Sequence, residues 1–117
     1  MNLFRLFRHP KHLKDLTPAE VAALSHATQP PVLLDVRTTA EFRLGHVGGA
    51  LSFPLGHEDA IITNFSATQK VVLICKTGHR SQAAAASLFA AGFVDVSHLK
   101  KGMDQWRREG RPVTREN

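Results

Sequence analysis

The stretch Val71-Val72-Leu73-Ile74-Cys75-Lys76-Thr77-Gly78-His79-Arg80-Ser81 decides how the chain folds. Its first four residues form an uninterrupted apolar run, which is typical of a strand buried on both faces of a parallel sheet. A helix rich in alanine is expected over residues 80–91, and its small side chains let it lie close to the sheet. The loop between them leaves the carboxyl end of a strand, which is the edge where α/β sheets bind their ligands.

Further strands and helices are expected on either side of this stretch. Thr17 can cap a helix, with Glu20 closing a capping box, and Thr38 or Thr39 can cap another. Gly92 can take the left-handed conformation that ends a helix. The remaining helices are predicted over residues 18–24, 40–44, 57–65 and 103–109, and the remaining strands over 32–36, 50–53 and 94–99.

This alternation of strands and helices is typical of an α/β domain, in which helices cover both faces of a mostly parallel central sheet. The 117 residues suffice for one such domain, which can bury a core without disulfides. We divide the chain into a basic N-terminal arm, residues 1–13, and the domain itself, residues 14–117.

Composition and charge narrow the classes of function. A single cysteine excludes an internal disulfide and a multi-cysteine metal site and suits a reducing compartment, so we expect the cytoplasm. The net charge of +5 favours anionic partners. Charge without an interleaved aromatic patch does not indicate nucleic-acid binding. The apolar runs of the N-terminal arm are too short for a signal peptide or a transmembrane segment.

Cys75 is the candidate nucleophile, because it opens the loop between the best strand and its helix. That loop can curl so that its backbone N–H groups point inward and bind an anion, and the start of the helix adds partial positive charge. Lys76, His79 and Arg80 are possible basic neighbours, so we expect Cys75 to be held as a thiolate. Gly78 permits a backbone angle that other residues resist. The residues expected to hold the anion are Lys76, Thr77, Gly78, His79, Arg80 and Ser81.

Four segments form an ordered set of motifs along the chain. One is the Cys-x-x-Gly-x-Arg-Ser spacing of residues 75–81. The others are Leu34-Asp35-Val36-Arg37 with Glu41-Phe42, Gly45-His46-Val47-Gly48-Gly49-Ala50, and Leu99 to Trp106 with Gly110-Arg111-Pro112-Val113. Together they resemble the rhodanese family over about residues 14–115. Gly48 stands where that family usually has proline, and Lys101 stands where it usually has a first glycine.

The resemblance implies a sulfurtransferase that needs no cofactor. The Cys75 thiolate would attack the outer sulfur of a small anionic donor such as thiosulfate and release sulfite. The persulfide would then pass its sulfur to cyanide, another thiophilic acceptor or the thiol of a partner protein. Loop N–H groups would hold the terminal sulfur. Arg80 would brace the loop or attract the donor, and Lys76 and His79 would lie at the mouth of the site.

Asp35 and Arg37 are expected to support the loop. Asp35 ends a strand at the same edge of the sheet, where it can orient the loop, bind the backbone or pair with an arginine. Arg37 is close enough in sequence to pair with Glu41. His9 and His12 could share a helix face, but two histidines without further ligands are weak evidence for a metal, so we predict none.

Alternative functions stay open. Cysteine-dependent phosphatases and arsenate reductases also combine a cysteine, an anion-binding loop and an arginine, but their loops are longer than the segment Lys76 to His79. A shorter loop gives a smaller cradle, which suits one sulfur atom better than a tetrahedral phosphate. A non-catalytic binding or regulatory module with the same fold is the other alternative, although such modules often lack the cysteine that this chain has.

Overall fold

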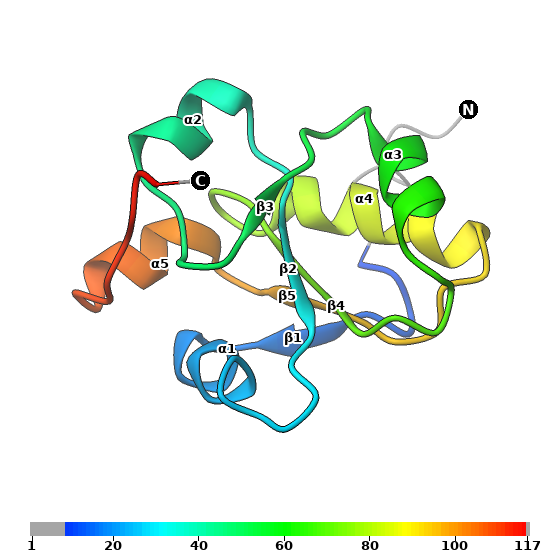
Figure 1. Cartoon of the computed structure of the whole chain (residues 1–117), viewed down its shortest axis with the longest axis horizontal. Helices are drawn as coiled ribbons and strands as arrows, with labels where there is room; N and C mark the ends of the chain where they lie inside the picture. The colour runs from blue at the N-terminus through cyan, green and yellow to red at the C-terminus, as the bar shows by residue number, and fades with distance from the viewer. Residues whose placement is uncertain (1–8, 117) are drawn as a thin grey trace.

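Strands and helices alternate along the computed structural model, which describes residues 9–116 (Figure 1). The strands are β1 (Lys14–Leu16), β2 (Val32–Asp35), β3 (Leu51–Ser52), β4 (Val71–Ile74) and β5 (Val96–Leu99). The helices are α1 (Pro18–Leu24), α2 (Thr39–Leu44), α3 (Glu58–Asn64), α4 (His79–Ala90) and α5 (Gly102–Arg108). Every predicted element is present, with ends that match or differ by one or two residues.

The strands form one sheet in the order β1-β5-β4-β2-β3, and every strand pair in it is parallel. The predicted α/β architecture with a parallel sheet is therefore confirmed. Strand β4 lies in the middle, as its uninterrupted apolar sequence predicts, and all four of its residues are buried. Strand β1 was not predicted, because it is short and polar and lies at the edge of the sheet.

Helices cover both faces of the sheet (Figure 1). Successive strand residues face opposite sides, so Leu73 joins the core beneath α3 and α4, whereas Val72 joins the core beneath α1, α2 and α5. Alanines Ala84 and Ala85 of α4 are fully buried, and their small side chains let this helix lie close to the sheet. The Cys75 side chain belongs to the α3–α4 core.

Local signals begin or end three of the helices where the sequence predicts. Thr17 and Glu20 form the expected capping box at α1, and Thr38 caps α2. Gly92 has a φ of 95°, and the Phe93 amide donates to the Leu88 carbonyl, which satisfies the end of α4.

Leu13, the last residue of the predicted N-terminal arm, is buried in the α3–α4 core. The proposed boundary between arm and domain stays a prediction, since most of the arm, residues 1–8, lies outside the described residues. Among residues 9–116, no helix combines the length and apolar character needed to cross a membrane.

Candidate functional site

The Cys75 sulfur is surrounded by backbone donors where β4 passes into α4. The amide of Gly78 donates to Sγ over 3.0 Å, and the amide of Ser81 lies 3.4 Å from the same atom. Cys75 itself has no exposed surface. Both amides belong to the loop and the first turn of α4, so the positive end of that helix points toward the sulfur. The site is therefore arranged to stabilise negative charge on a sulfur atom.

Contacts with the junction between β5 and α5 hold this loop in shape. The Met103 amide donates to the Cys75 carbonyl over 2.8 Å, and the Asp104 amide donates to the Lys76 carbonyl over 3.0 Å. A β-carbon on Gly102 would lie 2.3 Å from the Lys76 carbonyl oxygen. Only glycine allows this approach, which gives a physical reason for glycine at position 102.

Asp35 and Arg37 form an ion pair beside the loop, and both are almost completely buried. The Arg37 guanidinium reaches Asp35 through Nε and Nη2, and Nη2 also donates to the Gly45 carbonyl over 2.8 Å. The prediction that Asp35 pairs with an arginine is confirmed. The prediction that Arg37 pairs with Glu41 is wrong, because the side chain of Glu41 points to Arg80 instead.

Arg80 forms a two-armed ion pair with Glu41 of α2. Its Nη1 and Nη2 atoms donate to the two carboxylate oxygens over 2.6 and 2.9 Å. Hydrogen bonds from Arg80 outweigh the effect of burial and lower the pKa of Glu41 to about 2. The pKa of Arg80 is raised, chiefly by Glu41 and to a smaller extent by Cys75 and Asp35. This geometry favours the bracing role of Arg80, since a carboxylate already balances much of its charge.

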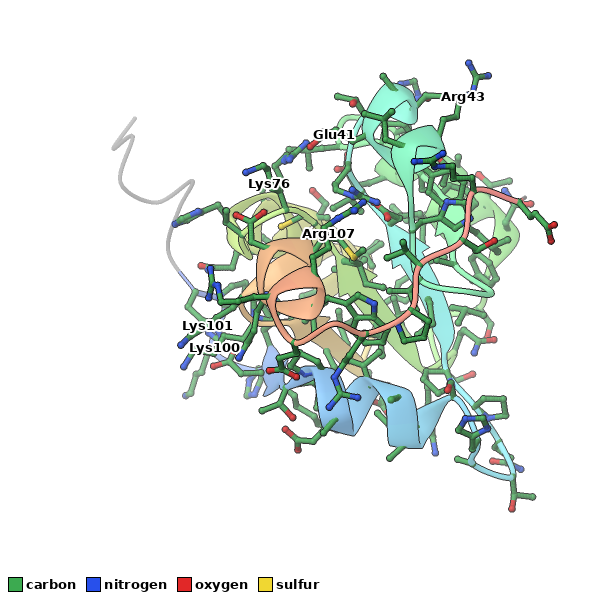
Figure 2. All side chains as sticks on the ribbon, turned by 90° about the vertical axis from the view of Figure 1, so that its left-hand side faces the viewer. Glu41, Arg43, Lys76, Lys100, Lys101 and Arg107 are labelled. Atoms are coloured by element: carbon green, nitrogen blue, oxygen red, sulfur yellow. The ribbon has the colours of Figure 1, made fainter. Side chains whose placement is uncertain are left out.

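Lys76, Thr77 and His79 form the exposed side of the loop. The Nζ atom of Lys76 lies 3.3 Å from a carboxylate oxygen of Asp104, and Thr77 Oγ1 lies 2.9 Å from Nδ1 of His79. An exposed ion pair such as Lys76–Asp104 contributes little to stability. The ammonium group of Lys76 can therefore leave Asp104 and attract an anion. Figure 2 shows Lys76, Lys100 and Lys101 around helix α5, together with Arg107 on that helix.

Comparison with known proteins places this arrangement in a family. The profile of the family described as "Rhodanese-like domain" matches residues 17–109. The chain belongs to the rhodanese-like family. It is 33% identical over 86 residues to a sulfurtransferase of Allochromatium vinosum, covering 74% of this chain and 80% of that protein. It is also 33% identical over 94 residues to the thiosulfate sulfurtransferase GlpE of Pseudomonas fluorescens, covering 80% and 84%.

A longer relative and a solved structure agree with this assignment. The probable adenylyltransferase/sulfurtransferase MoeZ of Mycobacterium tuberculosis is 32% identical over 99 residues, but the match covers 83% of this chain and 25% of that protein. The crystal structure of a rhodanese-related protein from Thermoplasma volcanium has a TM-score of 0.77 and 25% identity, covering 88% of this chain and 99% of that one. The rhodanese-like fold therefore accounts for nearly the whole described chain.

Two residues next to this candidate site, His98 and Asp15, were not predicted from the sequence. His98 lies on β5 with no exposed surface, and its Nδ1 atom is 2.6 Å from the hydroxyl oxygen of Ser81. Its Nε2 atom is 2.8 Å from Oδ1 of Asp15 on the neighbouring strand β1. A histidine inside a buried strand is a signal that the sequence contained, but the sequence did not reveal which partners it meets.

His9, Asp15 and His98 are the one group of three possible metal-ligating side chains found among residues 9–116. Asp15 Oδ1 lies 2.6 Å from His9 Nε2 and 2.8 Å from His98 Nε2. Ligand atoms bound tetrahedrally to one zinc ion are about 3.3 Å apart, given bonds of about 2.05 Å. The observed separations are those of hydrogen bonds, so we describe this group as a hydrogen-bonded cluster.

Proposed function

We propose that this rhodanese-like chain carries sulfane sulfur on Cys75, from a small anionic donor such as thiosulfate to cyanide, a small thiol or a partner protein's thiol. The observation that supports this most is the pair of backbone amides, Gly78 and Ser81, that converge on the Cys75 sulfur. They offer hydrogen bonds to a thiolate and to the anionic persulfide that follows it.

The reaction has two balanced steps. The Cys75 thiolate attacks the outer sulfur of thiosulfate, a new S–S bond forms, and the donor's own S–S bond breaks. Sulfite leaves with the electron pair of the broken bond. A nucleophilic acceptor then attacks the terminal sulfur of the persulfide, and Cys75 leaves as a thiolate. No oxidant, reductant or cofactor is required for this exchange.

The loop residues have different roles in this proposal. Gly78 and Ser81 bind the sulfur, while Arg80 braces the loop through Glu41. Lys76 and His79 are exposed at the mouth, where positive charge raises the local concentration of an anion. Because Cys75 is completely buried, the donor reaches it only when side chains or the loop shift.

The names of relatives support both kinds of partner. Thiosulfate is part of the name of GlpE, whereas the relative YrkF of Bacillus subtilis is named a putative sulfur carrier protein. We propose the cytoplasm as the place of action, because a chain with a single cysteine suits a reducing compartment.

Intact-mass spectrometry tests this function directly. Incubation with thiosulfate should make the protein one sulfur atom heavier, and cyanide should remove that sulfur as thiocyanate. Cys75→Ala should gain no mass and show no turnover. A mass gain in Cys75→Ala would show that another residue carries the sulfur. A wild-type protein that gains no mass with thiosulfate or with a persulfide donor would favour a non-catalytic binding module.

A further inference from the structure

Three residues connect the Cys75 sulfur to the edge of the sheet through consecutive hydrogen bonds. Ser81 Oγ lies 3.5 Å from Cys75 Sγ and 2.6 Å from His98 Nδ1. His98 Nε2 lies 2.8 Å from Oδ1 of Asp15. The sheet register explains the alignment, because Asp15 is the direct partner of His98 across β1 and β5. Cys75 follows β4, which is the other neighbour of β5.

The direction of these hydrogen bonds follows from the charge states. Burial raises the pKa of Asp15, but hydrogen bonds from His9 and His98 outweigh it and hold that pKa below its usual value. Asp15 is therefore an acceptor, and His98 Nε2 carries the proton. Burial lowers the pKa of His98 more than Asp15 raises it, so the ring is neutral near neutral pH. Nδ1 then accepts the hydroxyl proton of Ser81, and the Ser81 oxygen accepts from the Cys75 thiol.

We infer that His98, oriented by Asp15, takes the thiol proton of Cys75 through the hydroxyl group of Ser81. This inference rests on the proposed role of Cys75 as the nucleophile. Ser81 is the only member of the relay that touches the reacting sulfur. His98 and Asp15 act through it and are positioning residues.

The proton balance of this step is simple. The Cys75 S–H bond breaks as its proton moves to Ser81 Oγ, and the original hydroxyl proton of Ser81 moves to His98 Nδ1. Cys75 becomes a thiolate, His98 becomes an imidazolium, and Asp15 stays ionised. Both hydrogen bonds reverse direction, so Nδ1 now donates to Ser81, whose hydroxyl can donate to the sulfur anion. The Gly78 carbonyl, 3.1 Å from Ser81 Oγ, is a weaker alternative acceptor.

Charged groups from several elements face this relay. Asp15 on β1 favours the imidazolium, whereas His9, which precedes β1, and Lys100, which follows β5, disfavour it. The new Cys75 thiolate favours the imidazolium as an opposite charge. Arg80 on α4 in turn stabilises the thiolate, because its charge interacts with Cys75. Asp15 and the thiolate thus oppose the effects of His9 and Lys100 on the imidazolium, while Arg80 stabilises the thiolate.

Alkylation of Cys75 by iodoacetamide tests the relay without any sulfur donor. The chain has a single cysteine, so the rate of mass gain reports only on Cys75. His98→Asn keeps a polar group near the Nδ1 position but cannot take a proton. Asp15→Asn changes a partly exposed residue of an edge strand, so it is expected to fold even where His98→Asn does not. Ser81→Ala removes the hydroxyl but keeps the amide.

All three variants should alkylate about ten-fold more slowly than wild type at about pH 7, which corresponds to a loss of about 1.4 kcal/mol in stabilisation of the reactive thiolate. The difference should shrink to about two-fold at about pH 10, because hydroxide then ionises an ordinary thiol without a relay. His46→Asn is the matched control, since His46 is also buried with both ring nitrogens hydrogen-bonded, but to the Phe42 and Glu116 carbonyls. It should alkylate like wild type at both pH values.

Three results would overturn the relay. The first is that Asp15→Asn and Ser81→Ala alkylate at the wild-type rate at about pH 7. The second is that the relay variants alkylate more slowly than wild type by the same factor at both pH values. The third is that His46→Asn alkylates as slowly as the relay variants. The proposed sulfur transfer fails separately, if wild-type protein alkylates rapidly but gains no sulfur from any donor. Circular dichroism at each pH keeps loss of folding from being counted as loss of the relay.

Discussion

The α-carbon of Gly78 lies against the backbone carbonyl of Lys100, so closely that a β-carbon on Gly78 would be 1.9 Å from that oxygen. Gly78 also has a φ of 97°, in the left-handed region that favours glycine. Conformation and lack of space therefore both require glycine at the position whose amide binds the Cys75 sulfur.

Gly78→Ala should consequently damage both stability and sulfur transfer. We expect a loss of about 3 kcal/mol in the free energy of unfolding, from left-handed strain and overpacking together. Gly56→Ala is the control, because Gly56 has a φ of 98° but no atom within 4 Å of a β-carbon. It should lose only about 1 kcal/mol, the cost of the conformation alone. Equal losses in urea unfolding would show that the Lys100 contact has no effect.

Glu41→Gln should reveal a contribution to stability that depends on pH. The folded-state pKa of Glu41 is about 2, below its usual 4.5, so its stabilisation is complete above pH 4.5 and is lost as pH falls through about 2. After allowance for solvent screening, we expect Glu41→Gln to be less stable by about 1–2 kcal/mol at neutral pH. That difference should approach zero near pH 2.

Unfolding of wild type and Glu41→Gln by urea, measured across this pH range, gives the comparison. Glu109→Gln serves as the control, because Glu109 pairs with Arg111 over 2.9 Å at an exposed position. Exposed pairs contribute about 0–1 kcal/mol, so its effect should be smaller. A Glu41→Gln defect that stays constant down to pH 2 would contradict the assignment to the Arg80 ion pair.

Lys76→Ala should weaken capture of an anionic donor more than the chemistry on bound donor. We expect a higher KM for thiosulfate with kcat much less changed, and a defect that shrinks as salt rises. Lys70→Ala is matched to it, since Lys70 is an exposed lysine at the opposite end of β4. Steady-state kinetics across a salt series would refute this idea if the KM defect persisted at high salt, or if Lys70→Ala behaved the same.

Phosphatase activity should be negligible. Lys76 to His79 separate Cys75 from Arg80, and the resulting loop directs the Gly78 and Ser81 amides at a single sulfur atom. Release of phosphate from an aryl phosphate measures this, with thiosulfate turnover in the same preparation as the positive control. Appreciable phosphate release that Cys75→Ala abolishes would favour the phosphatase alternative.

Much of the fold followed from local signals. The apolar run of β4, the capping residues Thr17 and Thr38, and Gly92 all act through neighbours within a few residues, so their effects can be predicted without a structure. Strand β1 escaped prediction because an edge strand with two exposed residues has no apolar run. Its place in the sheet depends on pairing with a strand that is distant in sequence.

Ion-pair partners were harder to predict than the residues themselves. Closeness in sequence suggested a pair between Arg37 and Glu41, but Arg37 turns back to the buried Asp35. Glu41 lies in the first turn of α2, where it accepts from Thr38, and that position directs its carboxylate toward Arg80 of α4. The choice of partner was decided by the relative placement of two helices, which no local pattern specifies.

The sequence by itself determined the α/β class, the position of Cys75 at a strand-to-helix loop and the presence there of Gly78, which can take a backbone angle that other residues resist. Those features depend on hydrophobic pattern and backbone conformation, which are local. Only the tertiary structure decided that Asp15 and His98, 83 residues apart, lie side by side and reach Ser81. The physical reason is that parallel strands pair across long connections, so the order β1-β5-β4 is set by the packing of the whole domain.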